Sequence, residues 1–286
     1  MQVRFWGTRG SIAAPGPTTM RYGGNTACVE VRLNDGTLII FDAGTGIRAL
    51  GQALLTQPKP IQAYLFLSHA HWDHIQGLPF FIPAYIGGTE LTILGPEHDT
   101  LTLEEIVTGQ MQTPYFPIPM HVMAATIKFV KLGEGQVFTL PNGTTVEAGQ
   151  VNHPGCTLGY RLTAQGKVLA YTTDNEPFGD ALASRHMVRP ARHLALVQQA
   201  DLLIQDAQYT PEEYAPQRIG WGHSTYLHAV QLAQQAHVKR LALFHHDPSH
   251  SDEDIDQILA HCREYIAQHH GALECVGAAE GVVLLL

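Results

Sequence analysis

The sequence predicts an α/β fold in which strands and helices pack in layers, and three observations support this. The first half contains short runs of β-branched and aromatic residues separated by turns. The last third alternates apolar strand-like runs with helical segments, which is typical of βα units. A hydrophobic share of 45% over 286 residues suits a chain with a large core. No repeat or long linker interrupts it, so we expect a single domain over residues 1–286.

Strand and turn signals dominate the amino-terminal part. Asn34-Asp35-Gly36 predicts a hairpin turn, because such residues adopt the left-handed backbone that tight turns require. An apolar run at 63–68 reads as a buried strand that ends at the first histidines. The expected strands are 3–7, 27–33, 37–44 and 63–68, and a helix is expected over 46–55.

The remaining part predicts more strands and then alternating helices and strands. Ser224 and Ser251 are the expected amino-terminal caps of two of these helices. The expected strands are 126–132, 136–140, 144–151, 158–163, 167–174, 201–207, 240–246 and 282–286, and the expected helices are 192–200, 224–236 and 252–269.

Residues 96–125 are expected to be irregular, because prolines interrupt them repeatedly. We interpret this segment as an ordered excursion that forms either a lid or a homodimer contact. Tyr115 and Phe116 would either face a substrate base or simply pack within the segment.

Charge and cysteine content limit the partners. The net charge is −9 and no basic run of five residues occurs, which argues against a large nucleic-acid partner. No apolar stretch approaches the roughly 18 residues of a membrane span, and no signal peptide is expected. Four cysteines without a C-x-x-C pair indicate reduced thiols and a cytoplasmic location.

The strongest chemical signal is the segment Ser68-His69-Ala70-His71-Trp72-Asp73-His74, directly after a predicted buried strand. Buried without partners, three imidazoles and a carboxylate would cost several kcal/mol. His69 and His71 point the same way on an extended chain, and a turn after Trp72 brings Asp73 and His74 to a second point. This pattern favours two adjacent cations over a solvated polar loop. Nitrogen and carboxylate ligands suit Zn²⁺, Mn²⁺ or Fe.

Further candidate ligands follow predicted strands downstream. These are His153, Asp174 and His245. Taken alone, each is more typical of a hydrogen-bonded structural residue. They become candidate ligands because of their order along the chain after the first motif.

The whole arrangement resembles the metallo-β-lactamase superfamily. The resemblance covers almost the whole chain and implies a four-layer αββα sandwich with the metal site at one edge. It implies a first metal held by His69, His71 and His153, and a second held by Asp73, His74 and His245. Asp174 would bridge the two, and His245 is preferred to His246 because it directly follows the strand.

Within this superfamily, the chain is most similar to the phosphodiesterase branch that includes the tRNA 3′-end processing endonuclease. Gly222-His223-Ser224-Thr225 opens a predicted helix as in that branch. Asp206 falls at the branch's acidic position, although with Asp for Glu and with Gln205 in place of a histidine. The chain also lacks the basic Gly/Pro-rich arm that would hold tRNA.

The expected mechanism is phosphodiester hydrolysis. Two metals about 3.5–4 Å apart would generate hydroxide at neutral pH, and this hydroxide would attack phosphorus in line. His223 would protonate the leaving alkoxide and Asp206 would orient it, so the predicted catalytic residues are His223, Asp206 and Asp73. The alternative interpretations are that His223 is only a histidine at a helix start and that Asp206 is a solvated carboxylate at a strand end.

We expect a small nucleotide substrate, cyclic or short. The alternatives are hydrolysis of a carboxylic ester, lactone or thioester, tRNA 3′-end cleavage, and a non-catalytic metal-binding module.

Three features have weaker interpretations. Asp42 either orients a ligand histidine or is a turn residue, residues 23–26 form either a structural turn or a substrate-facing loop, and Cys156 is either a buried hydrophobe or a neighbour of the metals.

Overall fold

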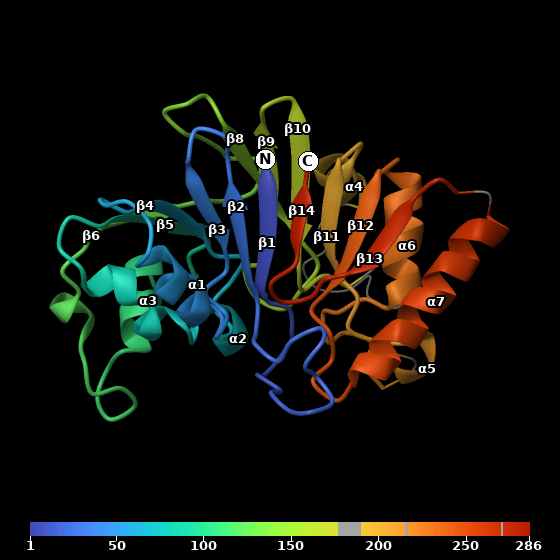
Figure 1. Cartoon of the computed structure of the whole chain (residues 1–286), viewed down its shortest axis with the longest axis horizontal. Helices are drawn as coiled ribbons and strands as arrows, with labels where there is room; N and C mark the ends of the chain where they lie inside the picture. Colours follow the sequence, from blue (N-terminus) through green and yellow to red (C-terminus); the bar gives the residue numbers. More distant parts are fainter. Residues whose placement is uncertain (177–189, 215–216, 270) are drawn as a thin grey trace.

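The computed structural model describes residues 1–176, 190–214, 217–269 and 271–286, and two seven-stranded sheets form its centre (Figure 1). The first sheet runs β14 (Val283–Leu285), β1 (Gln2–Gly7), β2 (Cys28–Arg32), β3 (Leu38–Phe41), β4 (Gln62–Phe66), β5 (Glu90–Gly95) and β6 (Thr126–Lys131). The second runs β13 (Glu274–Gly277), β12 (Arg240–Phe244), β11 (Leu202–Asp206), β10 (Lys167–Thr172), β9 (Leu158–Ala164), β8 (Thr145–Gln150) and β7 (Val137–Thr139).

Each sheet contains a parallel block. In the first sheet β3 to β6 pair in parallel, and in the second β10 to β13 do so. Carboxyl ends of parallel strands lie at the same edge of a sheet, and this is where α/β proteins place their ligands. The polar residues that follow β3, β4, β10 and β12 therefore come together at one edge of the sandwich.

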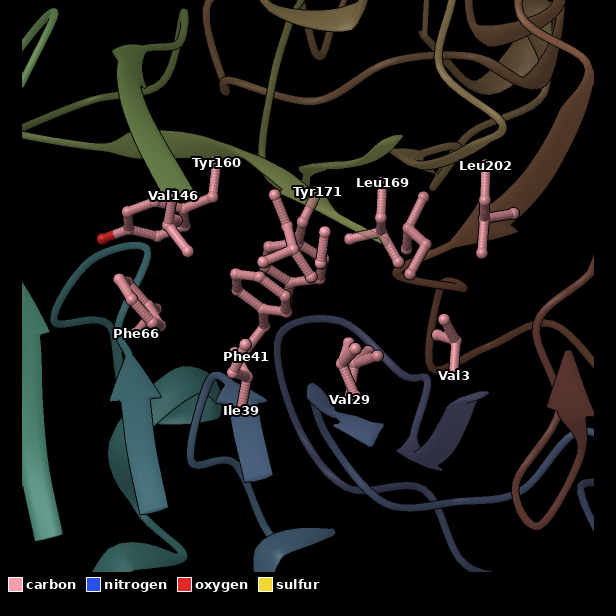
Figure 2. Packing of buried hydrophobic residues seen from close by; sticks show 14 of the residues in the cluster. Val3, Val29, Ile39, Phe41, Phe66, Val146, Tyr160, Leu169, Tyr171 and Leu202 are labelled. Atoms are coloured by element: carbon pink, nitrogen blue, oxygen red, sulfur yellow. The ribbon is translucent and has the colours of Figure 1, made fainter. Parts of the chain in front are cut away.

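The apolar core lies between the two sheets. Its largest side chains are aromatic, and Phe41 of the first sheet stacks on Tyr171 of the second at a centroid distance of 5.1 Å. Figure 2 shows these two rings meeting across the interface, with Phe66 and Tyr160 beside them. Offset-stacked rings add stabilisation beyond their buried area, so this contact fixes the two sheets against each other.

Helices cover the outer face of each sheet. In α1 (Ile47–Leu54), Ile47, Leu50 and Leu54 lie on one face and pack on the first sheet with the short helices η1 (Leu78–Phe80) and η2 (Ile82–Tyr85). On the second sheet lie α4 (Pro190–Val197), α6 (Tyr226–Gln235) and α7 (Asp252–Gln268). The order is helix, sheet, sheet, helix, which confirms the predicted αββα sandwich (Figure 1).

Several local expectations need correction. The prediction omits β5 and β13, and β13 has only four residues, so its strand character depends on pairing with β12. The segment 96–125 is not wholly irregular, since it contains α3 (Leu103–Gly109), which Thr102 caps, and η3 (Met120–Val122). Ser251 caps α7 as predicted.

The predicted cap of the helix after Gly222 is wrong by one residue. Thr225 caps α6, whereas Ser224 donates its hydroxyl to Asn175 O and its N–H to the carboxylate of Asp206. The remaining helices are α2 (Trp72–Ile75) and α5 (Pro211–Tyr214). Among the helices of the described ranges, none is both long and apolar enough to cross a membrane.

Candidate metal centre and active site

The site is built from residues that directly follow strands of both sheets. Asp42 follows β3, Asp174 follows β10 and His245 follows β12, and all three have a left-handed backbone, with φ of 60°, 47° and 60°. Side chains other than glycine rarely adopt this conformation, which costs about 1–3 kcal/mol per residue. The fold therefore holds these residues against a local preference, as functional sites often do.

All seven predicted ligands come together in two groups that share one aspartate. Within each group, the candidate ligand atoms lie within 4.8 Å of one another. The first group is His69, His71, His153 and Asp174, and the second is Asp73, His74, Asp174 and His245.

Asp174 lies between the groups with one oxygen toward each. Its Oδ2 is 3.6 Å from His69 Nε2 and 3.7 Å from His153 Nε2, in the first group. Its Oδ1 is 3.1 Å from His74 Nε2 and 3.2 Å from His245 Nε2, in the second. This geometry is suited to a carboxylate that bridges two cations.

Hydrogen bonds on the far side of the imidazole rings fix their tautomers. Where Nδ1 faces an oxygen acceptor, it carries the proton, and Nε2 then presents its lone pair to the centre of the group. Three rings are held in this way: His74 by Asp42 Oδ2 at 2.8 Å, His153 by Gly222 O at 2.9 Å, and His245 by Gln208 Oε1 at 3.1 Å.

Each unprotonated Nε2 faces into its group, where a positive charge is needed. His74 Nε2 is buried without a hydrogen-bond partner among the described residues, yet it lies 3.2 Å from Asp73 Oδ2 and 3.1 Å from Asp174 Oδ1. A lone pair facing two carboxylates is repelled unless a positive charge lies between them. The donor set of imidazole nitrogens and carboxylate oxygens therefore fits divalent metal ions.

The pKa values of the site residues depend on burial and on the charges of their neighbours, which oppose each other in two of the three cases below. Burial would lower the pKa of His74, but the charges of Asp174, Asp73 and Asp42 outweigh it and raise this pKa well above its usual range. Burial lowers the pKa of His153 to about 4, so this ring is neutral at physiological pH, the form in which imidazole binds metals. Burial would raise the pKa of Asp174, but the histidines around it lower it instead.

His223 and Asp206 form a separate pair beside the second group. His223 Nδ1 lies 2.7 Å from Asp206 Oδ2, and the ring stacks on His245 at 5.1 Å. Burial would lower the pKa of His223, but the charge and the hydrogen bond of Asp206 raise it to about 9. The ring is therefore protonated at neutral pH.

Asp206, His223 and His245 also lie close enough to form a third metal-binding group. However, Asp206 accepts hydrogen bonds from the amides of Asn175, Gln208 and Ser224 as well as from His223. Four donors fill the lone-pair positions of a carboxylate. Asp206 therefore acts as a support for His223, and a solvated carboxylate is excluded because it is fully buried.

A cavity of about 430 Å³ opens onto both groups and onto His223. This volume lies within the range of small-molecule sites. Its lining residues are Ser11, Ala70, His71, Trp72, Asp73, Asp174, His223 and His245. Trp72 is 80% exposed and is the large apolar side chain of this lining.

The loop after β1 also contributes to the site, which was not predicted from its sequence. The Ser11 N–H donates to Asp73 Oδ2 at 2.8 Å, and Ser11 lines the cavity. Gly10 packs so closely that an added Cβ would lie 2.4 Å from the ring of His245. Two glycines and a serine in Gly7-Thr8-Arg9-Gly10-Ser11, directly after a strand, were the signal that could have identified this loop.

The structure bears on the three features that had alternative interpretations, which are Asp42, residues 23–26 and Cys156. Asp42 contacts His74 and also accepts hydrogen bonds from Ser68 and Tyr171, so it orients a site histidine. Residues 23–26 form a structural turn, in which Gly23 O accepts from the buried Arg9. Cys156 is exposed, so it is not a buried hydrophobe, and it belongs to neither group of candidate ligands.

Tyr115 and Phe116 do not line the cavity. Tyr115 is 87% exposed, and Phe116 packs edge-to-face on Phe80 at 5.6 Å. Among the described residues that line the cavity, the large aromatic side chain is that of Trp72, which lies inside the metal-binding motif itself.

Comparison with known proteins places this geometry in a family. The sequence model of the Beta-lactamase superfamily domain matches residues 37–246, which include all seven clustered residues. A ribonuclease Z of Natronomonas pharaonis is 26% identical over 303 residues, which span 90% of this chain and 92% of that protein.

Two solved structures share the fold over nearly their whole length. Human tRNase Z, short form, has a TM-score of 0.66 and 20% identity, with coverage of 100% of this chain and 99% of that chain. Zn²⁺-bound PqqB from Methylobacterium extorquens has a TM-score of 0.69 and 17% identity, with 100% of each chain covered. With the two metal-binding groups, these findings show that the chain belongs to the metallo-β-lactamase superfamily and is a metal-dependent hydrolase.

Proposed function

We propose that this hydrolase binds two divalent cations, with zinc preferred to manganese or iron, and cleaves a phosphodiester bond in a small cyclic or short nucleotide. The observation that carries the proposal is the His223–Asp206 pair beside the metal-binding groups. An alkyl phosphodiester releases an alkoxide, which is a poor leaving group and benefits from a proton donor, whereas a thioester releases a less basic thiolate that needs one less.

The proposed ligand sets follow the two groups. His69, His71 and His153 would hold the first cation, and Asp73, His74 and His245 the second, with Asp174 shared. When bound, such cations supply a nucleophilic hydroxide at neutral pH and polarise the phosphoryl oxygens. Zinc is preferred because imidazole nitrogen suits it and because a relative of this fold carries it.

The protein's own contribution to the chemistry is proton transfer at His223. Asp206 holds the proton on Nδ1, so the Nε2–H is the group available to the cavity. The charge and the hydrogen bond of Asp206 raise the pKa of His223 and so favour the protonated ring, and an alkoxide, which is far more basic, would take this proton. Asp206 stays hydrogen-bonded throughout and stabilises the ring in one orientation.

The shape of the cavity supports a small substrate with an aromatic group. A volume of about 430 Å³ suits a mononucleotide or dinucleotide portion. Trp72 offers an exposed ring beside His71 and Asp73, on which a nucleobase can stack.

Precursor tRNA is the second candidate substrate, because the curated relatives are named ribonuclease Z. The charge of this chain favours the small substrate instead. With a net charge of −9 and no basic run, a folded RNA would find few partners for its phosphates.

A direct competition between substrates tests the proposal. We would incubate the enzyme with Zn²⁺ or Mn²⁺ and offer 3′,5′-cyclic nucleotides, dinucleotides and a precursor tRNA at moderate salt, with lactones and thioesters as further arms. We expect turnover of a small nucleotide. Efficient tRNA trimming without turnover of any small nucleotide would show that the substrate assignment is wrong.

We further propose a homodimer contact, rather than a lid, for residues 96–125. Exposed apolar side chains on this segment support it, namely Leu101, Tyr115, Ile118 and Val122. Sedimentation of the wild type and of Tyr115→Glu should give a dimer and a monomer, respectively. A monomeric wild type would leave the lid as the better interpretation.

A further inference from the structure

Glu176 is a buried carboxylate that the proposed mechanism does not use. It lies two residues after Asp174 and is 2% exposed. Its main chain is fixed to the segment that carries His153, because its N–H donates to Asn152 O at 2.8 Å and its carbonyl accepts from Asn152 Nδ2 at 3.1 Å. Burying a carboxylate is costly unless donors replace its water, so the groups around it explain its presence.

Three donors surround the carboxylate, namely one hydroxyl at the end of α5 and two backbone amides of residues 220–222. Oε1 accepts from the Tyr214 hydroxyl at 2.6 Å and from the Gly220 N–H at 2.8 Å, and Oε2 accepts from the Gly222 N–H at 2.8 Å. No Lys, Arg or His forms an ion pair with it within the described ranges. The negative charge of Glu176 is thus directed at backbone amides of residues 220–222.

That loop contacts both kinds of functional histidine. Gly222 O accepts from His153 Nδ1 at 2.9 Å, and with φ of +87° an added Cβ at Gly222 would lie 2.2 Å from this nitrogen. The next residue is His223, whose ring stacks on His245 and lines the cavity. The position of this short loop therefore sets where both His153 and His223 lie.

We propose that Glu176 is a positioning residue that holds the 220–222 loop, and through it orients His153 in the first metal-binding group and places His223 at the cavity. The part of this inference that concerns proton donation rests on the proposed function of His223. The part that concerns the orientation of His153 does not.

The hydrogen-bond pattern requires the carboxylate of Glu176 and not only a side chain of the same shape. A carboxylate accepts at both oxygens, whereas a glutamine side chain accepts at one end and donates at the other. In Glu176→Gln, the amide NH₂ would face either the Gly222 N–H or the pair formed by Gly220 N–H and Tyr214 OH. Donor would then face donor, and the loop would move away on that side.

The test compares Glu176→Gln with Glu212→Gln, which removes the same charge from a nearby exposed position. The first readout uses metal-free protein labelled with ¹⁵N-histidine, so that it depends on neither metal nor substrate. We expect the hydrogen-bonded Nδ1–H signal of His153 in the wild type and in Glu212→Gln, and its loss in Glu176→Gln.

The second readout is a double-mutant cycle with His223→Ala on the metal-loaded enzyme. We expect Glu176→Gln to lower kcat for an alkyl phosphodiester roughly 10- to 100-fold with little change in KM, because a displacement of about 1 Å has effects of this size. In the His223→Ala background, the same change should cost less than about threefold, because residues that act through one another are not additive.

Tyr214→Phe is a milder variant for the case that Glu176→Gln does not fold. It removes one donor and leaves the carboxylate, so we expect a loss of kcat of roughly two- to fivefold that also disappears in the His223→Ala background. Equal losses in both backgrounds would overturn the part of the positioning role that concerns His223, and an unchanged His153 signal in Glu176→Gln would overturn the part that concerns His153. If His223→Ala alone had no effect while the His153 signal still disappeared, the proposed function of His223 would fail and the role of Glu176 at His153 would stand.

Discussion

Two histidine–aspartate pairs with nearly the same geometry serve different parts of this site. His74 Nδ1 is 2.8 Å from Asp42 Oδ2, and His223 Nδ1 is 2.7 Å from Asp206 Oδ2. Asp42 follows β3 of the first sheet and Asp206 ends β11 of the second. Both aspartates are fully buried, and other donors saturate each of them.

The two pairs differ in what the other ring nitrogen faces. His74 is fully buried, and its Nε2 lies near two carboxylates. His223 is 8% exposed at the cavity, and its ion pair in the described part of the chain is with Asp206. This difference in the environment of Nε2 is the basis for proposing His74 as a metal ligand and His223 as a proton donor.

Removing the histidine of each pair should separate these roles most strongly. We expect His74→Ala to lose metal from its group and to lose turnover, because an open tetrahedral site needs each of its few protein ligands. His223→Ala should keep its full metal content. Elemental analysis of the purified variants checks this, and a His74→Ala protein that retained two equivalents would remove His74 from the ligand set.

Substitution of the exposed Trp72 tests whether the cavity recognises a base. Trp72→Ala should raise KM for a nucleotide about 10-fold, since stacking of a base on an aromatic ring contributes about 1–3 kcal/mol. A phosphodiester without a base should be unaffected, and Trp72→Phe should restore most of the affinity. A uniform loss for both substrates would point to a disturbed metal-binding motif rather than to lost stacking.

His193 extends the comparison to a buried histidine outside the two groups, and we expect its substitution to have no effect on turnover. Burial lowers its pKa to about 4, below the ordinary value of about 6.5. The unfolded chain therefore binds a proton that the folded chain excludes, so stability is full above pH 6.5 and falls as the pH decreases toward 4.

The pH-dependent contribution of His193 to the free energy of unfolding is about 3 kcal/mol at most, because each pKa unit corresponds to about 1.4 kcal/mol. His193→Gln should flatten the pH dependence of the free energy of unfolding in this window, measured by urea titration. An unchanged slope between pH 6.5 and 4 would show that His193 is not the group responsible.

The parts of the site that lie close together in the sequence were predictable from it. Residues 69–74 carry four candidate ligands in six positions, and their strand and turn setting can be inferred from neighbouring residues. His153, Asp174 and His245 carry weaker local signals, and their order along the chain identified them through resemblance to a family. A layered α/β fold was predictable from the strand-like runs of the first half and the alternation in the last third, whereas the four-layer αββα order came from the same family resemblance.

The parts that depend on tertiary contacts were not predictable. Ser11 reaches Asp73 from 62 positions away, and Glu176 acts on amides more than 40 positions away. Ser224 has the composition of a helix cap, but contacts with Asn175 and Asp206 draw it into the site instead. A sequence pattern describes what a residue can do locally, whereas these roles depend on which backbone groups the fold brings to it.

The most direct test of the central claim is the dependence of His223→Ala on the leaving group. We would measure kcat/KM for matched alkyl and aryl phosphodiesters with the wild type and the variant, both loaded with metal. A positioned proton donor contributes roughly 10²- to 10⁴-fold, and an aryl leaving group departs without help. The account predicts a loss of that size for the alkyl substrate and a much smaller loss for the aryl substrate. Equal losses for the two substrates would contradict it and would remove His223 from the role of proton donor.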